Sequence, residues 1–146
     1  PAARPVGNVA FNLARVEAGW PWFGIDATDR NLPQELNRDD RAISFVKGCY
    51  LGQETVARID ALGHVNQTLC GLVLPGETPP TAEAELTHDG KAAARITSAV
   101  FSPRLQTPLA LAYVRRGFHS PGTQLNTELG PAKVVSLPLA EDIGPQ

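Results

Sequence analysis

The feature that most constrains the fold is a series of short β-like runs after Gly63. Six runs rich in apolar residues, separated by turn residues, span 68–74, 83–88, 91–97, 109–114, 123–127 and 132–137. Six short strands in succession predict a small closed barrel or a sandwich. Asp89 and Gly90, between the second and third runs, predict a two-residue type I′ hairpin turn. The expected core residues are Leu69, Leu72, Leu86, Ile96, Leu109, Leu111, Val134 and Leu137.

The first 63 residues have a different pattern. Apolar residues at helical spacing predict a helix that is capped by Asn8 and ends before Gly19, and a second helix over about 52–62. An ordered loop is expected over 20–40, and a short buried strand over 43–46. We therefore assign the chain to the α+β class and divide it into residues 1–63 and 64–146.

Composition argues against several kinds of partner. The 146 residues have a net charge of −2 with scattered basic residues, so a nucleic-acid partner is not expected. No apolar run approaches the ~20 residues of a membrane span. The two cysteines match neither a CxxC metal site nor a disulfide framework, which favours a reducing compartment. The cytoplasm or an organelle matrix fits this, and we expect the cytoplasm. Because the chain lacks methionine and opens on Pro1, we expect a piece of a longer protein.

The segment KGCYLGQE, at 47–54, holds the densest group of reactive residues. Cys49 lies just before the second predicted helix, whose N-terminus carries a partial positive charge, and Lys47 is two residues away. Both features favour the thiolate form of Cys49. The alternative is that Cys49 is a small buried apolar residue and that Glu54 and Arg58 form an ordinary helical pair. Cys70 lies in a predicted strand and should be buried and inert.

A second candidate site lies at the end of the first helix. Arg15 and Glu17 precede Gly19 and two tryptophans, which could offer a guanidinium and a flat apolar wall to an anionic ring compound. A solvated helix end is the alternative, since an arginine there is favourable without any ligand. The three histidines have no metal-ligand spacing, so no metal site is expected.

Four segments, ARVEAGWPWFGID at 14–26, LPQE at 32–35, KGCYLGQE at 47–54 and ARITSAVFSPRLQTPLALAYV at 94–114, together resemble the folate-binding YgfZ family, a branch of the aminomethyltransferase or glycine-cleavage T-protein superfamily. The resemblance implies a three-domain fold around a tetrahydrofolate pocket, with a six-stranded antiparallel β-barrel as its last domain. This chain resembles the C-terminal part. The N-terminal half of the same protein would supply most of the pocket wall.

The resemblance also implies roles for individual residues. Arg15 and Glu17 match the R-x-E-A-G segment near the folate, while Lys47 and Tyr50 match the YgfZ signature; these four are the expected folate-binding residues. Cys49 is the expected working thiol. The implied function is a tetrahydrofolate-dependent accessory protein that serves iron–sulfur proteins in assembly or repair and so affects tRNA modification. The alternatives are an aminomethyltransferase, with its acid or base carboxylate in the N-terminal half, and a barrel that acts only as a docking module.

Overall fold

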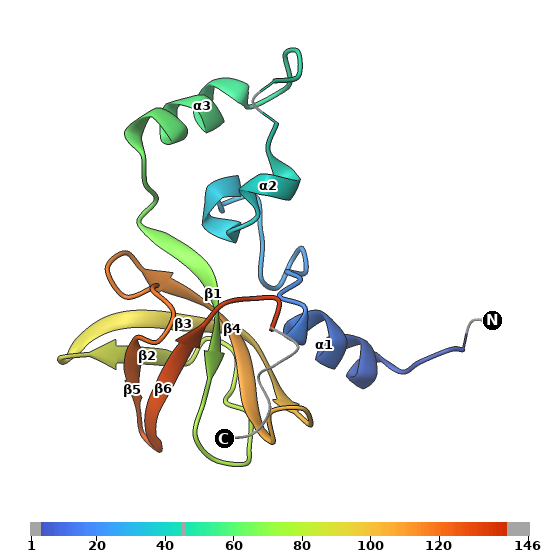
Figure 1. Ribbon diagram of the computed structural model, residues 1–146, viewed down its shortest axis with the longest axis vertical. Helices are drawn as coiled ribbons and strands as arrows, with labels where there is room; N and C mark the ends of the chain where they lie inside the picture. Colours follow the sequence, from blue (N-terminus) through green and yellow to red (C-terminus); the bar gives the residue numbers. More distant parts are fainter. Residues whose placement is uncertain (1–3, 45, 140–146) are drawn as a thin grey trace.

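The computed structural model describes residues 4–44 and 46–139, and its centre is a closed barrel of six strands (Figure 1). The strands are β1 (Gln67–Val73), β2 (Glu85–His88), β3 (Lys91–Ser102), β4 (Thr107–Arg115), β5 (Gln124–Thr127) and β6 (Gly130–Val135). They follow the order β1-β4-β3-β2-β5-β6 around the barrel, and every neighbouring pair is antiparallel. All six predicted runs are therefore confirmed as strands, and the closed barrel is confirmed over the sandwich.

The β2–β3 hairpin turn has the predicted geometry. Asp89 has a φ of 49° and Gly90 a φ of 73°. Both values lie in the left-handed region that a type I′ turn requires, and Asp and Gly tolerate it better than other residues. This turn fixes the register of the hairpin, with His88 opposite Lys91.

Two hydrophobic clusters share strand β4. Ala110, Ala112 and Val114 face the barrel interior and pack with Leu72, Leu86 and Ile96. Leu109, Leu111 and Tyr113 alternate with them and belong to a second cluster on the outer face, which also contains Leu69 and Val16. Because successive side chains of a strand point to opposite faces, β4 is buried on both of its faces.

The predicted core residues divide between these two clusters. Leu72, Leu86, Ile96 and Val134 fill the barrel interior. Leu69, Leu109 and Leu111 are buried core residues as predicted, but they belong to the outer cluster and not to the barrel interior. These three are buried beneath the N-terminal segment. Leu137 is only partly buried at the edge of the outer cluster.

Outside the barrel, the described residues form four short helices: α1 (Asn8–Glu17), the 3₁₀ helix η1 (Pro33–Leu36), α2 (Asp39–Ala42) and α3 (Gln53–Leu62). Helix α1 lies against the outer face of the barrel, where Val16 is fully buried. The N-cap residue is Gly7 and not Asn8, which is the first helical residue, and no side chain caps the helix. None of the helices in the described ranges is long and apolar enough to span a membrane.

The expected strand over 43–46 is wrong for the residues that the structure describes. Ile43 and Ser44 form no strand, and Val46 is 98% exposed in a bend; Phe45 lies outside the described residues. A short apolar run forms a strand only when a partner strand is available, and all six strands of the barrel are already paired.

The segment that follows β6 closes back over α1 and β1. Leu139 N donates to Glu17 O at 3.1 Å. Leu137 passes over two glycines: a Cβ on Gly19 would lie 2.5 Å from Leu137 Cβ, and a Cβ on Gly71 would lie 2.9 Å from Leu137 Cγ. A Cβ at either position would force Leu137 to shift, so both glycines favour the close approach.

Candidate functional site

Arg15 is buried at the end of α1. Its side chain is 6% exposed, and Nη1 donates to Asp26 Oδ2 at 2.6 Å. Nη2 donates to Ser98 Oγ and Nε to Asn12 Oδ1, both at 2.8 Å. The alternative of a solvated helix end is therefore wrong. The charge of Arg15 is compensated within the chain by Asp26, which limits what an anionic ligand would gain there.

Asp26 is the centre of this cluster. It is 1% exposed, and its Oδ2 also accepts a hydrogen bond from Trp22 N at 2.9 Å. Its Oδ1 accepts from Thr97 Oγ1 at 2.5 Å and from Ser98 Oγ at 2.6 Å. Tyr113 OH donates to the backbone carbonyl of Asp26 at 2.7 Å. Both carboxylate oxygens are satisfied, as a buried carboxylate requires.

A β-bulge in β3 allows two consecutive residues to serve Asp26. Ile96 pairs with Ala112 but Ser98 pairs with Leu111, so Thr97 is the extra residue. In a regular strand the side chains of Thr97 and Ser98 would point to opposite faces. The bulge re-aims them, and both hydroxyls reach the same carboxylate oxygen.

A groove of about 550 Å³ lies beside this cluster, between α1 and the second half of β3. Asn12, Arg15 and Ser98 supply its polar lining. The other lining residues are apolar: Val9, Leu13, Ile25, Ala99, Val100, Phe101 and Pro103. An apolar groove with a few convergent polar groups is the usual form of a small-molecule site, and this groove contains one of the predicted folate-binding residues.

Glu17 faces the turn between β3 and β4. Ser102 Oγ donates to its Oε1 at 2.5 Å, and the same hydroxyl accepts from Leu105 N at 3.2 Å. Glu17 therefore links α1 to the β3–β4 turn. Although it lies on the same helix as Arg15, it does not share the hydrogen-bond partners of Arg15.

The KGCYLGQE segment forms an exposed loop ahead of α3. Cys49 is exposed, so the alternative that it is a buried apolar residue is wrong. Lys47 Nζ lies 4.6 Å from the centroid of the Tyr50 ring, within the range of a cation–π contact. The helix that follows begins at Gln53.

The structure brings Lys47 and Tyr50 together but separates them from Arg15 and Glu17. Figure 1 shows the loop that holds Lys47 and Tyr50 at the far end of the molecule, beyond α2, whereas α1 lies beside the barrel. The predicted folate-binding residues therefore form two groups within the described part of this chain.

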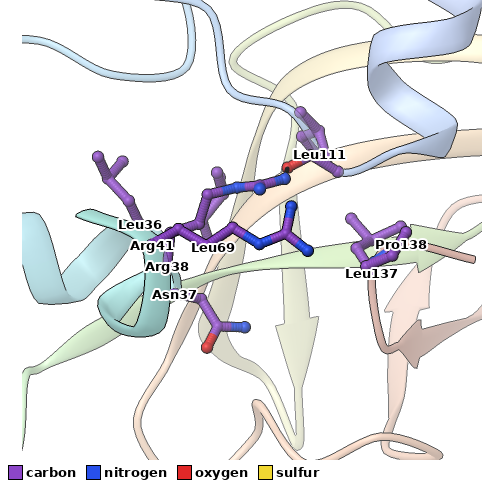
Figure 2. Close-up of a pocket in the computed structure, with 9 residues that line it drawn as sticks. Leu36, Asn37, Arg38, Arg41, Leu69, Leu111, Leu137 and Pro138 are labelled. Atoms are coloured by element: carbon purple, nitrogen blue, oxygen red, sulfur yellow. Dashed lines mark hydrogen bonds between the residues drawn. The ribbon is translucent and has the colours of Figure 1, made fainter. Parts of the chain in front are cut away.

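A small hollow of about 100 Å³ separates η1 and α2 from the segment after β6. Figure 2 shows the side chains of Arg38 and Arg41 extending into it from one side, with Leu137 and Pro138 on the opposite side. Arg38 Nη2 donates to Gly19 O and, at 3.2 Å, to Ala18 O. A cation at these carbonyls is favourable because they form the negative end of the α1 dipole. The two hydrogen bonds of Arg38 link the start of α2 to the end of α1.

The residues that the sequence analysis missed are Asp26, Thr97, Ser98 and Tyr113. Asp26 stands in a polar loop, where a carboxylate is ordinary, and its partners on β3 lie 71 and 72 residues away. One signal was available: two adjacent hydroxyl residues interrupt the apolar alternation of β3.

Within the described residues, 4–44 and 46–139, no group of three or more His, Cys, Asp or Glu side chains is placed to hold a metal ion.

Comparison with known proteins agrees with this fold. A solved structure, the glycine cleavage system aminomethyltransferase T from Bartonella henselae, superposes with a TM-score of 0.79 at 23% identity, over 94% of this chain and 40% of that one. An aminomethyltransferase of Streptomyces avermitilis is 31% identical over 150 residues, which cover 94% of this chain and 40% of the enzyme. The tRNA-modifying protein YgfZ of Colwellia psychrerythraea is 43% identical over 60 residues, 40% of this chain and 18% of that protein.

The chain spans two fifths or less of the length of each of these relatives. Residues 67–140 match the family described as the glycine cleavage T-protein C-terminal barrel domain, and the match covers half of the 146 residues. It begins at the first residue of β1 and contains all six strands. The chain therefore belongs to the glycine cleavage T-protein C-terminal barrel family.

Proposed function

We propose that this chain is the barrel-containing part of a cytoplasmic, tetrahydrofolate-binding protein of the YgfZ type, which serves iron–sulfur proteins and, through them, tRNA modification. The observation that carries the proposal is the KGCYLGQE loop, in which Cys49 is exposed and Lys47 stacks on Tyr50. The 43% identity to a YgfZ protein over 60 residues supports it. The N-terminal half of the same protein would complete the site.

The groove beside α1 fits the ring portion of a folate better than its carboxylates. Its apolar walls suit a flat heterocycle, and its polar groups lie together at Arg15 and Ser98. Because Asp26 already neutralises Arg15, we place the ring edge over this guanidinium. Lys47 and Tyr50 lie away from this groove (Figure 1), so their part in folate binding stays a prediction that does not involve the groove. When bound, tetrahydrofolate would supply the capacity to carry a one-carbon unit.

Titration with 5-formyltetrahydrofolate tests the groove. Trp22, which lies 5.7 Å from the Arg15 guanidinium, is an internal fluorescence probe. Ile25→Asp places a charge on a groove wall at a side chain that is already 54% exposed, so the fold should survive, and the dissociation constant should rise about tenfold. Leu129→Asp, at an exposed apolar side chain of the β5–β6 turn and outside the groove, is the matched control. Equal affinity of Ile25→Asp and the parent would contradict folate binding in this groove.

The role of Cys49 is tested by expressing the whole protein, with its N-terminal half, in cells that lack the YgfZ protein. The Cys49→Ser variant should fail to restore iron–sulfur enzyme activity, whereas the Cys70→Ala variant should restore it, since Cys70 is buried in β1. Full rescue by Cys49→Ser would remove the basis for a working thiol.

A second candidate function is an aminomethyltransferase, favoured by the match to the Streptomyces avermitilis enzyme over 94% of this chain. The acid or base carboxylate would then come from the N-terminal half. Folate-dependent one-carbon transfer that is unaffected by Cys49→Ser would favour this candidate over the first.

A further inference from the structure

The barrel has a second hollow, of about 440 Å³, at the end formed by the β1–β2 connection and the β5–β6 turn. Its floor includes Leu74, Leu86 and Ile96, which also belong to the interior cluster of the barrel. Leu129, at the tip of the β5–β6 turn, is 71% exposed on its rim. An opening that reaches the apolar interior, with an exposed leucine beside it, is suited to burying an apolar group.

The rim of this hollow carries negative charge. Glu85 and Glu128 line it, and no Lys, Arg or His side chain is among its lining residues in the part of the chain that the structure describes. The basic residue opposite Glu85 is Arg95, but its side chain donates two hydrogen bonds, at 2.8 and 2.9 Å, to the carboxylate of Glu83. The field at the opening therefore favours a cation.

We propose that this end of the barrel is a docking site for a peptide segment that carries a bulky apolar side chain beside a lysine or arginine. The apolar side chain enters the hollow over Leu74, Leu86 and Ile96, and the neighbouring cation meets Glu85 and Glu128. Burial of the apolar side chain supplies affinity, and the two carboxylates select the sign of the flanking charge.

The position of the hollow leaves the candidate functional site free. Figure 1 shows the β1–β2 connection and the β5–β6 turn at the end of the barrel opposite α2 and α3. The loop that contains Cys49 lies at the other extreme of the molecule. A partner held at the open end would therefore not cover the thiol, and docking is separable from folate binding.

The test is a nuclear magnetic resonance titration of the isotopically labelled chain with a capped peptide that has leucine between two lysines. Amide shifts should concentrate in residues 74–86 and 127–129. In the double variant Glu85→Gln, Glu128→Gln the dissociation constant should rise about tenfold, since each exposed ion pair contributes about threefold. Asp89→Asn is the matched control, because Asp89 is an exposed carboxylate at the β2–β3 turn and asparagine tolerates its positive φ.

Two further peptides separate the contributions. A peptide with alanine in place of the leucine should bind more weakly, and a peptide with leucine between two glutamates should not bind. The proposal is overturned if the glutamate peptide binds equally well, if the double variant keeps the parent affinity, or if millimolar lysine peptide shifts no amide in these two segments. Folate titration of the same variants is expected to be unchanged, so the two proposals fail independently.

Discussion

Asp26 connects three separate parts of the chain at one carboxylate. The carboxylate accepts hydrogen bonds from the guanidinium of Arg15 on α1, from a backbone amide of its own loop and from two hydroxyl groups on β3. Buried charges cost free energy unless they are paired and hydrogen-bonded. The cluster meets that condition, and its integrity depends on every partner being present.

Removal of Arg15 should therefore destabilise the protein strongly. Arg15→Gln leaves the Asp26 carboxylate buried without its counter-ion, and we expect the free energy of unfolding to fall by about 3–5 kcal/mol. Arg95→Gln is the matched control, because the side chains of Arg95 and Glu83 are 41% and 70% exposed; it should cost no more than about 1 kcal/mol. Urea denaturation of both variants measures the difference. Equal losses would show that Asp26 is not dependent on Arg15.

The two cysteines should differ in reactivity. Cys49 is exposed, whereas Cys70 is 7% exposed and burial raises the pKa of its thiol to about 11. Since the thiolate is the reactive form, iodoacetamide at neutral pH should label Cys49 at least tenfold faster, as measured by mass spectrometry of the peptides. Faster labelling of Cys70 would contradict the buried position of β1.

Stability should fall at alkaline pH. Burial raises the pKa of Cys70 from 9.0 to about 11 and is the main cause that raises the pKa of Tyr113 from 10.0 to about 12, with the nearby carboxylates of Glu35 and Asp26 adding to it. Both groups hold their protons more tightly when folded, so their contribution is complete below pH 9 and is lost as pH rises through 11 and 12. The loss from Cys70 is on the order of 3 kcal/mol. In a plot of the urea midpoint against pH, Cys70→Ala should make the decline between pH 9 and about pH 11 less steep. An unchanged slope in this range would exclude the Cys70 thiol as its cause.

At the scale of elements, the strands were predictable and their surroundings were not. Alternation of apolar residues and turn chemistry are local signals, and they located six strands and one hairpin turn. The same signals cannot tell the two faces of β4 apart, since alanine and leucine are both apolar. For the same reason Leu109 and Leu111 were predicted as core residues but not as members of the outer cluster, where α1 covers them.

A substitution at Gly71 tests how closely the segment that follows β6 packs on β1. A Cβ there would lie 2.8 Å from Val135 Cγ2 and 2.9 Å from Leu137 Cγ. Gly71→Ala should therefore lower the free energy of unfolding by about 1–3 kcal/mol through overpacking. Gly48→Ala is the control, since nothing lies within 4 Å of its added Cβ and its φ is ordinary. Equal denaturation midpoints would show that the final segment moves aside without cost.

At the scale of the molecule, the candidate site depends on contacts that no local pattern encodes. Arg15 and Cys49 could be chosen from residue type and resemblance. The cluster around Asp26 could not, because Thr97 and Ser98 are distant in sequence and a bulge sets their direction. The division into residues 1–63 and 64–146 remains a prediction.

Limited proteolysis should distinguish the two parts. Val46 and Leu51 are almost fully exposed in the loop between α2 and α3, and barrel closure protects strand edges. We expect the first cuts within residues 20–52, with the segment 68–138 surviving as one fragment on a gel. Cleavage inside the barrel before the loop would contradict this arrangement.

The burial of β4 on both faces has a consequence for how the protein opens. A strand that belongs to two apolar clusters cannot lose one of them without exposing half of its own side chains to water. Segments joined in this way open as one cooperative unit. The backbone amides of β4 should therefore exchange with deuterium only through global unfolding, at a free energy equal to that of the whole chain, while α3 exchanges through smaller local openings.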